Sequence, residues 1–156
     1  MNAAAEAQSL RDLYRELVLD HARNPRNFGK LDGPSHTAKG INPLCGDSLV
    51  LYLDVGTDDR VRGASFEGTG CVISIASASL LTETIVGMRT ADAARYFDVL
   101  RSRLSADPLT DPVIDLGKLQ ALEGVREYPS RVKCATLAWH ALDAALRGND
   151  TPATTE

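Results

Sequence analysis

The sequence has few of the features that mark membrane, secreted or nucleic-acid-binding proteins. No apolar run approaches the roughly 18 residues of a membrane-spanning helix. The formal net charge of −4 argues against the basic face that nucleic acid requires. The amino-terminal segment 1–6 lacks the basic start and apolar stretch of a secretion signal. We therefore expect a cytoplasmic protein that binds neither membranes nor nucleic acid.

Cysteine is also scarce, but the three cysteines present are informative. An odd number cannot all pair within one chain, and a reducing compartment keeps thiols free for metals or chemistry. No C-x-x-C pair occurs, so the spacing alone is a weak metal signal. The alternative is three buried core cysteines, which are common. The neighbours Gly46, Gly70 and Lys133 argue against this, because core cysteines usually lie within apolar runs.

Each cysteine lies where its thiol would be presented. Cys45 belongs to the loop sequence Asn-Pro-Leu-Cys-Gly-Asp, Cys71 follows Gly-Thr-Gly, and Cys134 follows Arg-Val-Lys. Cys71 and Cys134 are predicted at helix starts, where free N–H groups and the helix dipole stabilise a thiolate. Together with Asp47 they offer the four ligands of a tetrahedral metal. Thiolate-rich donors favour Zn²⁺ or iron–sulfur centres over Mg²⁺ or Ca²⁺.

The hydrophobic pattern predicts one α+β domain over residues 9–148, with a flexible start at 1–8 and a disordered tail at 149–156. Alternating apolar residues in 49–55 and again in 61–66 predict a hairpin. The stretch from Asn24 to Cys45 is interpreted as a loop, and 105–129 as irregular with a short helix near Lys118. Helices are predicted from a Ser9 cap to Asn24, over 72–88, from Thr90 or Asp92 onward, and from a Ser130 cap to Gly148.

Other polar residues are weaker site candidates. His21 lies on the apolar stripe of the first helix and is expected to pack there. His140 is six residues beyond Cys134 and faces another side of its helix, while His36 lies in the loop before Cys45. Arg131 is a candidate stabiliser of a thiolate or persulfide; the alternative is a surface charge at a helix start. Trp139 is predicted to fill the core.

Four sequence blocks resemble the U-type iron–sulfur cluster assembly proteins, the family of IscU, SufU and the amino-terminal part of NifU. With Tyr14, the blocks are 20–27, 42–47, 66–74 and 131–139. The resemblance covers about residues 10–148. It implies an IscU/SufU-like fold, in which a small antiparallel sheet packs against several helices.

Within that family the chain resembles the SufU branch. IscU proteins typically carry a histidine before the third cysteine, where this chain has Lys133, and a Leu-Pro-Pro-Val-Lys chaperone motif that residues 128–133 do not reproduce. The resemblance implies a Zn²⁺ ion bound by Cys45, Asp47, Cys71 and Cys134. It also implies a SufS-type, pyridoxal-phosphate-dependent cysteine desulfurase as partner, which passes persulfide sulfur to Cys45, and downstream iron–sulfur assembly proteins.

The resemblance makes a zinc-dependent sulfurtransferase the leading hypothesis. If the desulfurase offers a replacement ligand, Cys45 is the thiol expected to leave the metal, because it lies on a glycine-flanked loop. Two alternatives stay open at this point. One is a scaffold that assembles and transfers a [2Fe–2S] cluster, or holds iron, on the same ligands. The other is a non-catalytic, zinc-stabilised binding domain.

Overall fold

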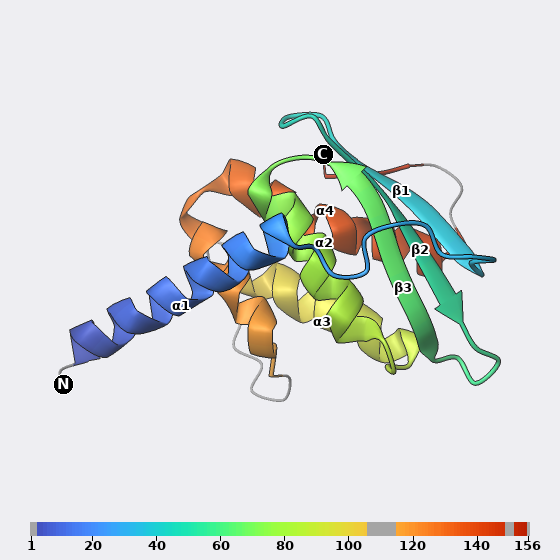
Figure 1. The fold of residues 1–156 in the computed structure, drawn as a ribbon, viewed down its shortest axis with the longest axis horizontal. Helices are drawn as coiled ribbons and strands as arrows, with labels where there is room; N and C mark the ends of the chain where they lie inside the picture. The colour runs from blue at the N-terminus through green and yellow to red at the C-terminus, as the bar shows by residue number, and fades with distance from the viewer. Residues whose placement is uncertain (1–2, 106–114, 149–151, 156) are drawn as a thin grey trace.

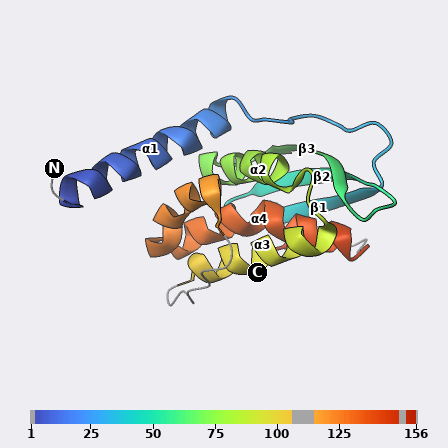
Figure 2. The same ribbon diagram turned by 90° about the horizontal axis from the view of Figure 1, so that it is seen from below.

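The computed structural model describes residues 3–105, 115–148 and 152–155, in which a four-stranded sheet packs against helices (Figure 1, Figure 2). The predicted α+β class is confirmed. In chain order the elements are α1 (Ala3–Arg23), β1 (His36–Asn42), β2 (Asp47–Val55), β3 (Val61–Thr69), α2 (Val72–Ile85), α3 (Thr90–Arg103), the 3₁₀ helix η1 (Gly117–Glu127), α4 (Pro129–Leu146) and β4 (Ala153–Thr154).

The strands lie in the order β3-β2-β1-β4. The β2–β3 hairpin is confirmed, and β1 pairs antiparallel with β2 so that Asn42 lies opposite Asp47. The short β4 runs parallel to β1, with Gly40 opposite Ala153. The sheet is therefore mixed, whereas an entirely antiparallel sheet was expected.

Strand β1 falls within the stretch that the sequence pattern assigned to a loop. Its buried residues do alternate, but they are Ala38, Gly40 and Asn42, which carry little apolar surface. A period-two hydrophobic pattern was therefore absent. Gly40 is where α4 approaches the strand, since a Cβ there would lie 3.1 Å from the Leu137 Cδ1 atom.

Helices α2 and α4 contact each other and the sheet, and the core lies between these layers (Figure 2). Leu51 and Leu53 of β2 are fully buried, as is Trp139 of α4, which confirms its predicted core position. Small polar residues of α2 allow the close approach of the two helices. Ser77 is one of them, and its hydroxyl donates to the Ala135 carbonyl 2.5 Å away.

The ends of several elements differ from the predictions. Helix α1 begins at Ala3 rather than at Ser9, because the alanine-rich segment before Ser9 favours helix. Its first turns extend away from the rest of the molecule (Figure 1). Helix α4 begins at Pro129 with Tyr128 as its N-cap, so Ser130 is not the cap. A proline with fixed φ suits the first position of a helix.

Both expected flexible segments contain regular structure where they are described. Residues 3–8 belong to α1, and residues 153–154 of the expected tail form β4. The short helix predicted near Lys118 is η1, whereas residues 106–114 of the predicted irregular segment lie outside the described residues. No helix in the described ranges is both long and apolar enough to cross a membrane.

His21 of α1 is buried, as expected, and joins α1 to α2. Its Nδ1 lies 2.7 Å from the Ser79 hydroxyl oxygen, which also accepts the Arg26 backbone N–H. Its Nε2 lies 3.5 Å from a Glu83 carboxylate oxygen. Burial, followed by the charge of Arg26, holds the pKa of His21 below its ordinary value of 6.5, so the ring is neutral at pH 7.

The metal-free protein should lose stability as the pH falls below the ordinary histidine pKa of 6.5. The folded chain binds this proton less readily than the unfolded chain, so acid favours unfolding until the lowered pKa of folded His21 is reached. His21 should contribute a fall in the free energy of unfolding of at most about 1.4 kcal/mol per pH unit in that window. Urea unfolding at several pH values, with chelator and reductant present, measures it. Equal pH dependence in a His21→Gln variant would contradict the assignment.

Candidate metal centre

Four chain segments meet at one end of the sheet. Residues 43–46 connect β1 to β2 and carry Cys45, and Asp47 is the first residue of β2. Cys71 is the N-cap of α2, and Cys134 lies in the second turn of α4. Gly46 has a φ of 71°, a backbone conformation that other residues rarely adopt, and this allows the tight loop between the two strands.

Three of the four predicted donors are close neighbours. One ligand atom each of Cys45, Asp47 and Cys134 lie within 4.8 Å of one another. The Cys45 and Cys134 sulfurs are 3.4 Å apart, and both thiols are free. Cys45 is exposed, whereas Asp47 and Cys134 are buried. The group therefore contains one solvent-accessible thiol, that of Cys45, and two buried donors.

The Asp47 carboxylate is held from two sides. Its Oδ1 accepts the backbone N–H of Cys71 at 2.9 Å, and its Oδ2 accepts the Asn42 side-chain amide at 3.2 Å. The residue is only 1% exposed. These hydrogen bonds fix the orientation of the carboxylate, as outer contacts do for metal ligands.

Cys71 lies beside this three-donor group. Its thiol is 3.9 Å from the Ser74 hydroxyl, and the Ser74 hydroxyl in turn donates to the Cys71 carbonyl. Cys71 is not among the three residues whose ligand atoms lie within 4.8 Å of one another, but its backbone N–H donates to Asp47. As N-cap of α2 it occupies the helix start predicted for it.

Cys134 is not at a helix start, which corrects the prediction. It is in the second turn of α4, beyond the first turn in which the helix dipole acts. Burial raises the pKa of the Cys134 thiol, and the neighbouring donors Cys71, Cys45 and Asp47 raise it further. A thiol in this setting becomes an anion only if a cation balances the crowded negative charge.

Two residues that support the site were not assigned a role from the sequence. Asn42 is fully buried and donates to Asp47 and, at 3.5 Å, to the Cys134 sulfur. Gly70 leaves room for the carboxylate, since a Cβ there would lie 2.6 Å from Asp47 Oδ1. The sequence signal for Asn42 is the loop 43–46: if two strands pair as a hairpin around it, Asn42 lies opposite Asp47.

The histidines and Arg131, the other candidates from the sequence, do not belong to the three-donor group. His21 is packed between α1 and α2. His140 forms an edge-to-face contact with the Phe97 ring, centroids 5.0 Å apart, and His36 lies 2.8 Å from the Ser35 hydroxyl. Arg131 is exposed in the first turn of α4.

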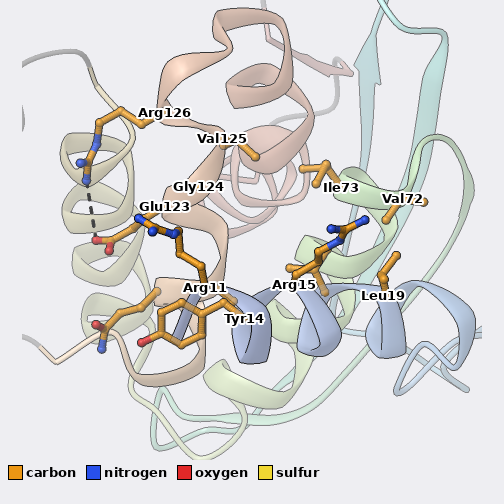
Figure 3. Close-up of a pocket in the computed structure, with 13 residues that line it drawn as sticks. Arg11, Tyr14, Arg15, Leu19, Val72, Ile73, Glu123, Gly124, Val125 and Arg126 are labelled. Atoms are coloured by element: carbon orange, nitrogen blue, oxygen red, sulfur yellow. Dashed lines mark ion pairs between the residues drawn. The ribbon is translucent and has the colours of Figure 1, made fainter. Parts of the chain in front are cut away.

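A groove of about 680 Å³ lies between α1, the start of α2 and η1 (Figure 3). Tyr14, Ile73 and Val125 line it together with the exposed Val72. Among the described lining residues there is no cysteine or aspartate. One lining residue, Val72, directly follows Cys71 in the sequence. None of the three grouped donors lines the groove.

A family model, the NifU-like N terminal domain, matches residues 13–147. This chain belongs to that family. The family match and the convergence of the cysteine segments agree with the resemblance seen in the four sequence blocks.

Named relatives are similar over nearly their whole length. A zinc-dependent sulfurtransferase SufU of Bacillus subtilis is 42% identical over 88% of this chain and 92% of that protein. An iron–sulfur cluster assembly scaffold protein IscU of Thermotoga maritima is 39% identical over 86% of this chain and 93% of that protein. A crystal structure from Fervidobacterium islandicum, described as a SUF-system scaffold candidate, has a TM-score of 0.77 and 29% identity, covering 84% of this chain and 94% of that one.

The donors of this family member fit a thiophilic metal ion. Two atoms bound to one zinc ion can be at most about 4.6 Å apart, twice a Zn–S bond. The sulfurs of Cys45 and Cys134, 3.4 Å apart, meet this limit. The two sulfurs of the group are soft donors and Asp47 supplies its one hard carboxylate, a balance that favours zinc or iron over magnesium.

Replacing Gly70 with alanine should weaken metal binding. The new Cβ would clash with the Asp47 carboxylate and with the Ser74 hydroxyl, so Asp47 must move. We expect about a 10-fold or greater loss of Co²⁺ or Zn²⁺ affinity, the size typical of disturbed ligand support. Titration against a competing chelator measures the change.

Gly124→Ala is the matched control for Gly70→Ala. A Cβ on Gly124 meets nothing within 4 Å, so this variant should bind metal like the wild type. Equal affinities for both variants would show that the position of Asp47 does not matter for metal binding.

Proposed function

We propose that this protein is a zinc-dependent sulfurtransferase that accepts persulfide sulfur on Cys45 for iron–sulfur cluster assembly. The observation that carries the proposal is one exposed thiol, Cys45, 3.4 Å from the buried thiol of Cys134 and grouped with Asp47. The similarity to the sulfurtransferase SufU supports it. We place the protein in the cytoplasm, where reducing conditions keep thiols free.

The residues proposed to hold the zinc ion are Cys45, Asp47, Cys71 and Cys134. A bound zinc ion would keep their thiols as thiolates at neutral pH. Cys71 is proposed as the fourth ligand because its backbone N–H donates to Asp47, so the two residues are adjacent. The hydrogen bonds to Asp47 hold its carboxylate in place throughout.

In the proposed transfer, the Cys45 thiolate attacks the outer sulfur of a persulfide on the donor protein. A sulfur–sulfur bond forms on Cys45 while the donor's own sulfur–sulfur bond breaks, and the donor cysteine leaves as a thiolate. The sulfur oxidation levels balance, so no other oxidant is needed. Cys45 suits this step because it lies on an exposed loop that turns at Gly46, whereas Asp47 and Cys134 are anchored in regular elements. Arg131, exposed near the start of α4, is a predicted stabiliser of the new persulfide anion.

The proposed partner is a cysteine desulfurase, of the pyridoxal-phosphate-dependent SufS type, with downstream iron–sulfur assembly proteins receiving the sulfur. Two exposed apolar side chains support docking at the site. Leu44, 60% exposed, precedes Cys45, and Val72, 45% exposed, follows Cys71. Apolar residues that flank a reactive thiol suit contact with a protein that delivers sulfur there.

The central test is cysteine desulfurase turnover with a stoichiometric amount of this protein. The zinc-loaded wild type should stimulate turnover and carry a persulfide on Cys45 that mass spectrometry detects. The Cys45→Ser variant should abolish both, because it lacks the accepting thiolate. No stimulation by wild type, or a Cys45→Ser variant that behaves like it, would overturn the proposal.

Leu44→Glu should weaken the interaction with the desulfurase without affecting zinc. A charge in place of an exposed apolar residue opposes burial at an interface, and we expect about a 10-fold rise in the concentration needed for half-maximal stimulation. Zinc content should equal that of the wild type, because the Leu44 side chain is exposed. An unchanged concentration dependence would exclude Leu44 from the docking surface.

The scaffold function is the second candidate, favoured by the similarity to IscU proteins. Anaerobic reconstitution with iron and sulfide separates the two. A stable [2Fe–2S] spectrum and transfer of the cluster to an apo-acceptor would favour the scaffold over the sulfurtransferase.

A further inference from the structure

Asn42 is a fully buried amide whose polar atoms all have partners in the site. Its Nδ2 donates to Asp47 Oδ2 at 3.2 Å and to the Cys134 sulfur at 3.5 Å. Its Oδ1 accepts the hydroxyl of Thr155 at 3.1 Å. A buried amide is tolerated only when its hydrogen bonds are made, so this arrangement is a network and not a chance contact.

The chemistry of the partners decides which way the amide points. An ionised carboxylate and a thiolate accept hydrogen bonds and cannot donate them, so the NH₂ group must face Asp47 and Cys134. The Asn42 oxygen then faces away and needs a donor. The Thr155 hydroxyl supplies that donor, which makes Thr155 the residue that holds the amide in its useful orientation.

Strand pairing brings Thr155 to this position. β4 runs parallel to β1, with Ile41 opposite Thr154. The next residues are Asn42, the last of β1, and Thr155, which directly follows β4. The carboxyl-terminal end of the chain and the β1–β2 loop consequently lie at the same end of the sheet (Figure 1). A segment at the far end of the sequence thus reaches the side chain that contacts two of the proposed ligands.

We propose that Asn42 is a positioning residue for the metal ligands Asp47 and Cys134, held in place by the carboxyl-terminal segment 152–155 through Thr155. The inference rests on the proposed metal site. The Asn42 amide donates to both buried ligands and so fixes where their donor atoms lie. The exposed ligand, Cys45, has no such support from Asn42. The carboxyl-terminal segment therefore holds the buried ligands Asp47 and Cys134 in place. The Cys45 thiol is not held in this way and can leave the metal.

Three single substitutions test the role of the Thr155 hydroxyl. Thr155→Val removes the hydroxyl at nearly constant shape, Thr155→Ser keeps it, and Thr154→Val makes the same change on the exposed neighbour. Zinc affinity is measured in the full chain by competition with a chromogenic chelator. The absorption spectrum of the Co²⁺-substituted protein reports ligand geometry, and thermal unfolding of the metal-free proteins reports stability.

We expect Thr155→Val to bind zinc about 10-fold more weakly than the wild type, the lower end of the effect of losing ligand support. Its Co²⁺ spectrum should also shift. Thr155→Ser and Thr154→Val should match the wild type in both readouts. The metal-free Thr155→Val protein should unfold at a lower temperature than Thr154→Val, because it leaves the buried Asn42 oxygen without a donor, and both variants should still be folded at the temperature of the zinc titration.

Several outcomes would overturn the inference. Wild-type zinc affinity in Thr155→Val would show that the amide needs no anchor, while the proposed function would stand. An equal loss in Thr154→Val, or a loss in Thr155→Ser, would assign the effect to the strand as a whole. If the wild type bound neither zinc nor cobalt, the proposed function itself would fail and this inference with it.

Discussion

The buried carboxylate of Asp47 is the group on which the geometry of the site depends. It begins β2, accepts the backbone N–H that starts α2, and accepts the amide at the end of β1. These two hydrogen bonds tie the loop that carries Cys45 to the helix that begins at Cys71. A carboxylate that is 1% exposed is costly to bury as an anion unless charge balances it. The fold therefore prepares a place for a cation.

Cys134 and Cys45 have different surroundings and therefore suit different roles. Cys134 is anchored in the second turn of α4, in surroundings that raise its pKa, and it becomes a thiolate only with a cation beside it. Cys45 is exposed on a four-residue loop with a left-handed glycine. Loss of Cys45 from a shared metal would disturb no helix and no strand pairing. Loss of Cys134 would leave a buried, unbalanced group. Ligand exchange is consequently cheapest at the thiol that a sulfur donor can reach.

An element can be predicted from the sequence when its buried side chains are large and apolar. The alternating leucines of β2 and the apolar stripe of α4 predict their elements correctly, because large side chains mark the core face. β1 buries Ala38, Gly40 and Asn42, and such residues leave no hydrophobic period. Of the four donors predicted to converge, Cys45, Asp47 and Cys134 do so. The depth of Cys134 within α4 was missed, because the helix begins at Pro129, ahead of the predicted Ser130 cap.

The uneven burial of the donors also bears on why a metal would be held here at all. A structural zinc site needs four ligands that stay bound, so an exposed ligand on a glycine loop brings it no advantage. Here two donors are buried and hydrogen-bonded to Asn42, whereas Cys45, whose sulfur is 3.4 Å from that of Cys134, is open to solvent. Rigid support for the buried ligands lets the ion stay when the exposed one leaves. That combination is what a thiol needs if it must be protected at rest and nucleophilic on contact with a partner, and it favours sulfur transfer over a purely structural role.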